Sequence, residues 1–200
     1  MKKTLLLLTI LISAVLSVSA QSDDSSPKLS AGFSVGATVG PHSGDFPVGS
    51  GVHIKLEYPI VENQVSLMVT AGYTLYVSSN GYYYNSNLDG TSTSSGDIAA
   101  FVPLQIGARF YVANRIFIQG DVGASFNINS TSSDYTGKKV ALLVSPSAGY
   151  ALPFGSTRFG LDFSLGYEDR LESGNSLTTA GYKSGSWGMA EFRLAFRFGL

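Results

Sequence analysis

The residue types best suited to catalysis gather in one short segment of the chain. The run Pro41-His42-Ser43-Gly44-Asp45 places an imidazole, a hydroxyl and a carboxylate within four residues. Nucleophilic catalysis needs such groups in mutual hydrogen-bond reach, usually from distant parts of a rigid scaffold. Three neighbours on one loop rarely reach that geometry. The segment therefore predicts an ordinary loop, and we expect no catalytic residues.

Residues that could hold a metal or a cofactor are equally sparse. The sequence has no Cys, and its second and last histidine is His53, close to Lys55 and Glu57. No Cys/His spacing is typical of a zinc site, and no glycine-rich phosphate loop is present. We expect no metal and no cofactor, and we expect His53 to be a packed polar residue. The net charge is −1 with no basic run, so nucleic acid is not an expected partner.

The composition indicates that much of the surface does not face water. Charged residues make up 14% of the chain, and Gly and aromatic residues are plentiful. Soluble domains devote about 25–35% of their surface to charged residues. After residue 20 no run of ~18 apolar residues could form a membrane-spanning helix. A membrane protein without such helices must be a closed barrel, because only a closed sheet satisfies every backbone hydrogen bond in lipid.

The N-terminal residues indicate secretion. Lys2 and Lys3 precede an apolar run from Leu5 to Leu16, and small residues then lead to Ala20. These are the three parts of a signal peptide. We predict a signal peptide over 1–20, a flexible lead-in over 21–28 and a transmembrane β-barrel over 29–200.

Eight segments alternate between apolar and polar residues with the period of two that is typical of strands. The breaks between them alternate in length, beginning with a long one. This asymmetry is typical of outer-membrane barrels with short periplasmic turns and long extracellular loops. It predicts an all-β, eight-stranded antiparallel up-and-down transmembrane barrel. The segments are 30–39, 50–58, 64–77, 98–112, 116–127, 140–151, 157–168 and 186–199; the long breaks are 40–49, 78–97, 128–139 and 169–185.

The two faces of each strand differ in charge, which decides their orientation. Leu104, Ile106 and Phe110, for example, alternate with Gln105 and Arg109. An Arg or Lys facing lipid at the bilayer midplane costs about 2–4 kcal/mol, so the charged face must point inward. The resulting interior set, structural or gating, is Lys55, Glu57, Arg109, Asp121, Arg158, Asp162, Glu168, Glu191, Arg193 and Arg197.

This interior set is balanced, with five basic and five acidic residues. Eight strands enclose a space that side chains just fill, so we expect ion pairs. We expect Asp162 nearly opposite Arg193 and Arg109 diagonal to Asp121. The leading hypothesis is a structural or surface-interaction barrel without catalysis. The alternatives are a narrow conduit whose ion pairs exchange partners, an enzyme at the barrel rim, and a soluble lipocalin-like barrel with its apolar face inside.

Two further features bear on the barrel wall. Pro103 and Pro146 lie inside predicted strands although proline cannot donate to a ladder, so we expect a bulge or local irregularity at each. Aromatic residues collect near the short turns, as in the interfacial girdle of a membrane barrel. They are Tyr58, Phe110, Tyr150, Phe159, Phe196 and Phe198.

One hairpin resembles a known family. Residues 101–111 read FVPLQIGARFY, and residues 116–123 read IFIQGDVG. This pattern resembles the central hairpin of the outer membrane protein β-barrel domain family, the small OmpA/OmpX-type barrels. The resemblance implies the barrel fold, the cell outer membrane, contact with its lipid and with the insertion machinery, and no shared catalytic residues. Such barrels commonly end on an aromatic residue, whereas this chain ends on Leu200. The polar loops 78–97 and 169–185 are candidates for binding a surface ligand.

Overall fold

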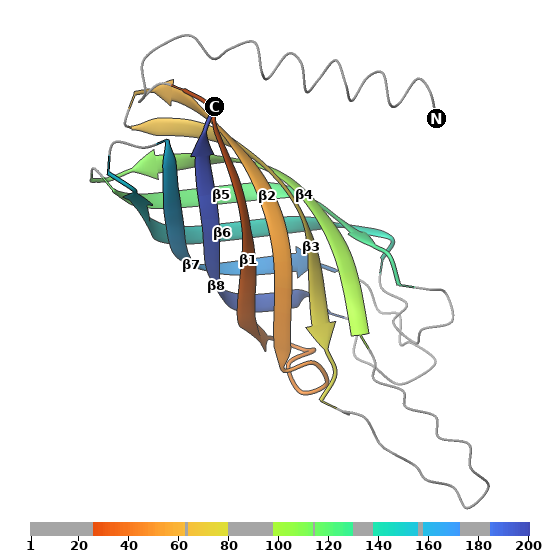
Figure 1. Cartoon of the computed structure of the whole chain (residues 1–200). Helices are drawn as coiled ribbons and strands as arrows, with labels where there is room; N and C mark the ends of the chain where they lie inside the picture. The colour runs from red at the N-terminus through yellow and green to blue at the C-terminus, as the bar shows by residue number, and fades with distance from the viewer. Residues whose placement is uncertain are drawn as a thin grey trace, which may run out of the picture.

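The sequence alternation produces eight antiparallel strands and a sheet that closes on itself (Figure 1). The computed structural model describes residues 26–62, 64–79, 98–113, 115–129, 138–155, 158–172 and 185–200. The predicted signal peptide and residues 21–25 lie outside these ranges. No helix within them has the length and apolar character needed to cross a membrane.

Every predicted segment coincides with a strand, and the strand ends differ from the prediction by at most three residues. The eight-stranded all-β fold is thus confirmed. The strands are β1 Lys28–Val39, β2 Val48–Val61, β3 Val65–Val77, β4 Ile98–Tyr111, β5 Ile116–Asn127, β6 Val140–Pro153, β7 Phe159–Leu171 and β8 Trp187–Gly199.

Each strand pairs with its neighbours in sequence, and β1 closes the barrel against β8. The closing ladder runs from Lys28 opposite Gly199 to Val39 opposite Gly188. Closure leaves no free sheet edge, which is the condition for a sheet to lie in lipid. The start of β1 and the end of β8 therefore lie together at the end of the barrel that carries the short turns (Figure 1).

The outer wall is apolar and the interior is polar, as the charge argument predicted. Ile106 is 64% exposed and Leu165 is 69% exposed, whereas Arg109 is 1% exposed. Large apolar side chains are exposed on all eight strands, far beyond the apolar patches of soluble monomers. A barrel with apolar side chains outside and charged side chains inside fits a transmembrane barrel. It excludes the lipocalin-like alternative, which needs its apolar face inside. The predicted girdle residues Tyr58, Phe110, Tyr150, Phe159, Phe196 and Phe198 are all exposed on this wall.

The two strand prolines interrupt pairing without shifting the register. Around Pro103 the β3–β4 ladder stops after Ala71–Leu104 and resumes at Thr74–Phe101 in the same register. Around Pro146 the β6–β7 ladder is interrupted in the same way. The predicted local irregularity is confirmed at both prolines. It is an interruption of the ladder and not a bulge. Each proline keeps its place in the β5 ladder, so only one side of its strand loses hydrogen bonds.

The one register shift lies elsewhere, between Pro59 and Val61 on β2. It adjoins the turn to β3, where Gln64 N–H donates to the carbonyl of Val61 at 3.0 Å. β2 therefore continues through the proline that the sequence suggested as the beginning of the turn. Its extra residues lie beyond the buried Glu57, so the shift leaves the interior unchanged.

Candidate functional site

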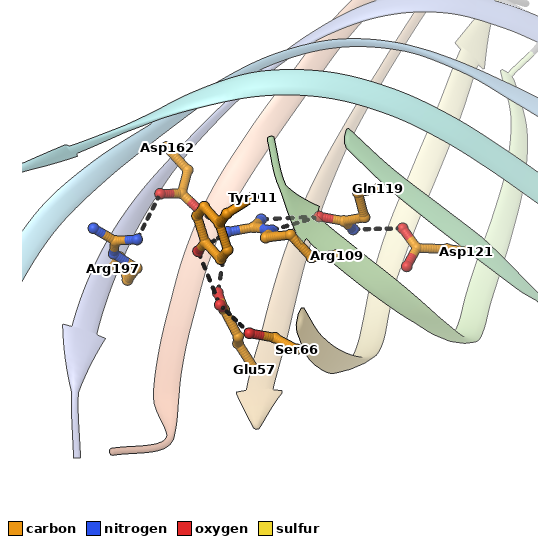
Figure 2. Close-up of polar contacts among 8 residues, drawn as sticks. All are labelled: Glu57, Ser66, Arg109, Tyr111, Gln119, Asp121, Asp162 and Arg197. Carbon is orange, nitrogen blue, oxygen red and sulfur yellow. Dashed lines mark hydrogen bonds and ion pairs between the residues drawn. The ribbon is translucent and has the colours of Figure 1, made fainter. Parts of the chain in front are cut away.

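A single arginine organises the interior near the short-turn end. Arg109 on β4 extends across the lumen to two acids on other strands (Figure 2). Its Nη1 lies 3.0 Å from Glu57 Oε2 and 2.7 Å from Asp162 Oδ2. The ring of Phe117 lies 3.9 Å from the guanidinium carbon. Arg109 thus joins strands β2, β4 and β7 through charge-assisted hydrogen bonds in a buried setting.

The two acids have further partners. Glu57 Oε1 accepts hydrogen bonds from Ser66 Oγ and from the Tyr111 hydroxyl, each at 2.9 Å. Asp162 Oδ1 lies 3.6 Å from Arg197 Nη1. Distributing each carboxylate over several donors offsets the large cost of removing it from water. Contacts from several strands therefore hold the two carboxylates in place in this part of the lumen.

An amide connects Arg109 to a third acid. Arg109 Nε and Nη2 donate to Gln119 Oε1 at 3.0 and 2.9 Å, and Gln119 Nε2 donates to Asp121 Oδ2 at 2.6 Å. Arg109 lies directly opposite Gln119 in the β4–β5 ladder, so Asp121 is diagonal to it. The predicted diagonal arrangement is confirmed. The two charges interact through Gln119 (Figure 2).

A second ionic cluster is centred on Arg193 of β8. Its Nη2 lies 3.3 Å from Glu168 Oε2, contacts Glu191, and donates to Ser145 Oγ at 2.6 Å. The hydroxyl of Thr74 donates to Glu168 at 3.4 Å. Asp162 lies diagonal to Arg193, close to the predicted near-opposite placement, but the ion pairs of Arg193 are with Glu168 and Glu191. In the β7–β8 ladder Arg193 lies opposite Ser164, two residues from Asp162.

A small cavity lies beside this second cluster. It has a volume of about 20 Å³ and is lined by Lys55, His53, Gln105 and Arg193 among others. A cavity needs about 10–15 Å³ to hold one water molecule. Lys55 is buried, and no carboxylate oxygen of the described residues forms an ion pair with it. The cavity is thus a polar compartment large enough to hold a water molecule.

The long-loop end of the lumen is closed by aromatic packing rather than by ions. Trp187 is the centre of a buried cluster in which its ring lies 5.0 Å from Phe46, 5.1 Å from Tyr76 and 5.4 Å from Phe101. The guanidinium carbon of Arg170 lies 4.6 Å from the Phe101 ring. We call this set the mouth cluster; its members are Phe46, Tyr76, Ala99, Phe101, Trp187 and Met189.

His42 belongs to the packing of this mouth. Its ring stacks on Trp187 with centroids 4.0 Å apart and planes 8° apart, and its Nε2 lies 3.3 Å from the Gly185 carbonyl. Ser43 Oγ instead donates to the Gly40 carbonyl at 2.8 Å, so hydroxyl and imidazole are not paired. Burial lowers the pKa of His42, while the Gly185 carbonyl and Asp45 oppose that shift. A neutral ring stacked in an apolar mouth is the result.

Comparison with known proteins yields similarity in fold alone. No protein-family model and no curated protein sequence matches the chain. Two crystal structures of the attachment invasion locus protein Ail of Yersinia pestis, one in complex with the heparin analogue sucrose octasulfate, are similar, each with a TM-score of 0.46. The complex is 14% identical and the match covers 86% of this chain and 97% of that one. The other is 13% identical, with coverages of 88% and 99%.

A designed transmembrane β-barrel is similar as well, at 14% identity with a TM-score of 0.40, covering 86% of this chain and 95% of that chain. At these identities and scores, the fold assignment rests on the closed ladder of the chain itself. The resemblance of residues 101–123 to the outer membrane protein β-barrel domain family stays a prediction at the family level. The barrel that it implied is observed.

The interior set differs from the prediction at two arginines. Arg158 lies in the turn before β7 and is exposed, so its assignment to the lumen is wrong. Arg170 is 1% exposed inside the barrel and contacts Glu172. The expected end of this strand at residue 168 hid Arg170, although it has the same parity as Asp162 and Glu168. The other predicted members, Lys55, Glu57, Arg109, Asp121, Asp162, Glu168, Glu191, Arg193 and Arg197, are buried or half-buried.

The mouth cluster is the part that sequence reasoning missed. Tyr76, Phe101 and Trp187 each lie an even number of residues from the inward polar residues of their own strand. Their side chains therefore point inward too. Polar residues mark the inward face in the sequence, so inward aromatic residues near the strand ends do not stand out there. Within the described residues no group of three or more His, Asp or Glu side chains could hold a metal ion. Of the loops 78–97 and 169–185, which are predicted to bind a surface ligand, residues 80–97 and 173–184 lie outside the described ranges.

Proposed function

We propose that the protein is a non-conducting barrel of the Gram-negative outer membrane with a structural or surface-interaction role and no catalytic step. The observation that carries this proposal is a lumen blocked at two levels. The mouth cluster fills the long-loop end, and the Arg109 network spans the lumen near the short-turn end. The apolar outer wall supports the membrane location.

The two blocks differ in kind, which makes simultaneous opening costly. Displacing Trp187 exposes the stacked His42 ring and the buried Phe46. Opening the second block separates Arg109 from Glu57 and Asp162, which leaves buried charges without their partners. The two clusters share no residue, so displacing Trp187 does not itself break the contacts of Arg109. We therefore favour a scaffold that presents its long loops outside the cell.

A narrow conduit is the second candidate, and the cavity beside Lys55 is the observation that favours it. The cavity has room for water between the two blocks, at about 20 Å³. Conduction of ions would require both blocks to move. The two candidates therefore predict different electrical behaviour.

Planar-bilayer recordings of the full-length mature protein distinguish them. The scaffold predicts no unit conductance steps for the wild type or for Trp187→Ala, because the Arg109 network still blocks the lumen. A control variant, Tyr73→Ala, removes an aromatic ring from the outer wall, where Tyr73 is 37% exposed. Steady unit conductance steps from the wild type would contradict the proposal. If these steps disappear when a residue of the lumen is substituted, the result establishes the conduit.

The orientation is tested separately by cysteine labelling, because the chain contains no Cys. Ser43 is exposed in the loop between β1 and β2, and Glu62 is exposed in the short turn between β2 and β3. On intact cells a membrane-impermeant maleimide should label Ser43→Cys and spare Glu62→Cys. Labelling of Glu62→Cys alone would reverse the orientation and remove the surface role.

A further inference from the structure

The outer wall is not uniform, and a groove in it crosses three strands. The groove has a volume of about 480 Å³ and is bounded by Phe110, Ile118, Gly120 and Pro146. Its lining is mostly apolar, and the bordering side chains of Phe110 and Ile118 are about half exposed, at 47% and 49%. The recess therefore lies on the surface that meets lipid.

The groove exists because small residues line up across the strands. Ala108 on β4 lies opposite Gly120 on β5, and Gly120 lies opposite Pro146 on β6. A Cβ added to Gly120 would have no atom within 4 Å, so the space beside it is open. The row beside it toward the short turns consists of larger residues, Phe110 and Ile118. The groove thus has walls as well as a floor.

A cation lies at the short-turn rim above this groove. Arg115, in the turn between β4 and β5, is exposed and donates a hydrogen bond to the Tyr150 hydroxyl at 3.3 Å. Tyr150 lies opposite Ile116 on the same outer face as Gly120 and Pro146. A guanidinium has five N–H donors arranged to bind phosphate, so the bond to Tyr150 leaves further donors for a ligand.

The spacing of cation and groove matches one lipid leaflet. Five residues separate Arg115 from Gly120, which is about 16 Å along a strand at ~3.3 Å per residue. With the strand tilt of ~45° of membrane barrels, the depth is about 12 Å. Half of a ~30 Å hydrocarbon core is about 15 Å. A lipid with its phosphate at Arg115 would therefore place an acyl chain in the groove.

We propose that strands β4, β5 and β6 form a specific site for one anionic phospholipid of the periplasmic leaflet. Arg115 and the Tyr150 hydroxyl hold the phosphate, and the groove at Gly120 and Pro146 holds an acyl chain. Charge complementarity selects this occupant, because a second copy of the chain would bring another Arg115 to the rim. The site goes beyond the scaffold role; it requires that the wall faces lipid and, as proposed above, that the short turns lie in the periplasm.

Native mass spectrometry of the full-length mature protein released from bilayer nanodiscs tests the site. The probes are palmitoyl-oleoyl-phosphatidylglycerol and the corresponding phosphatidylcholine, in equal amounts. The wild type should retain one phosphatidylglycerol and prefer it about tenfold, as expected for one charge-assisted contact of ~1.5 kcal/mol. Arg115→Gln should retain both lipids equally, because the phosphate contact common to both would no longer be reinforced by net charge.

Filling the groove should reduce retention of both lipids. Gly120→Leu replaces open space with a side chain and should lower retention about tenfold, which corresponds to roughly two lost acyl CH₂ contacts. Gly120→Val fills the groove less and gives a second variant if the first folds poorly. Ala71→Leu adds three of the same four carbon atoms on the exposed face of β3 and should leave retention unchanged.

Three results would overturn the proposal. The first is equal retention of the two lipids by the wild type, which would describe an unselective lipid annulus. The second is retention by folded Gly120→Leu at the level of the wild type. The third is a dimer mass in place of the lipid adduct, which would assign the groove to a second copy of the chain.

Discussion

Removing the Arg109 side chain is the sharpest test of how the interior is held together. Arg109→Met keeps much of the apolar stem and deletes the guanidinium that lies over the Phe117 ring. Glu57 and Asp162 then lose a partner at 3.0 and 2.7 Å. Because Glu57 is fully buried, water cannot replace that partner without opening the wall. The barrel should therefore lose much of its stability.

The magnitude follows from the remaining contacts. Removing one partner of a buried ion pair typically costs about 3–5 kcal/mol. Asp162 keeps Arg197 at 3.6 Å, and Glu57 keeps hydrogen bonds from Ser66 and Tyr111 at 2.9 Å. These contacts place the expected loss toward the lower limit, at about 3 kcal/mol.

Urea unfolding in lipid vesicles, followed by tryptophan fluorescence and by gel mobility of unboiled samples, measures this loss. Lys139→Met removes an exposed charge at the beginning of β6 and should change the unfolding free energy by less than about 0.5 kcal/mol. Adding Glu57→Gln to Arg109→Met should restore part of the loss by removing one buried charge. A loss below about 1 kcal/mol for Arg109→Met, or no recovery in the double variant, would refute a lumen held by buried ion pairs.

Three other predictions address the wall, the glycines and the mouth. Ile106→Arg, at a position 64% exposed, should cost about 2–4 kcal/mol in vesicles; a neutral result would mean that this face does not meet lipid. Gly107→Ala would place a methyl group 2.0 Å from Asp121 Oδ1 and should cost about 1–3 kcal/mol by unfolding titration. The matched Gly120→Ala meets no atom within 4 Å and should stay within about 0.5 kcal/mol; equal losses would contradict the assigned facing. Since burial lowers the pKa of His42 below its unfolded value of 6.5, stability should be full above pH 6.5 and fall as the pH drops below it; an unchanged pH dependence in His42→Phe would refute this.

The barrel could be predicted from the sequence because apolar and polar residues alternate in every strand, and this alternation sets the facing of each strand independently. In β5, Ile118 and Val122 alternate with Gln119 and Asp121, and a one-residue slip would place both polar groups in lipid. The same requirement repeats in β4, β7 and β8. An error in one segment is thus corrected by the need for the others to close with it. This redundancy explains why the strand ends agree within three residues.

The partners inside the lumen could not be predicted in the same way, because they depend on the stagger between strands. Asp162 lies diagonal to Arg193 in the β7–β8 ladder, close to the predicted placement, but its ion pairs are with Arg109 and Arg197. Contacts across the lumen are even harder to predict from the sequence. Arg109 and Asp162 lie on strands that are not neighbours, so no local pattern relates them.

The aromatic mouth and the ionic interior depend on one another. An ion pair in water contributes little, whereas in a medium of lower dielectric constant the same pair interacts several times more strongly. The mouth cluster creates that medium, because Trp187 and Phe46 are buried between the loop and the lumen. Inward aromatics near the strand ends are therefore consistent with the polar lumen beneath them. An open mouth would admit water to Arg193 and Glu168 and weaken the ion pair that joins β7 and β8 inside the lumen.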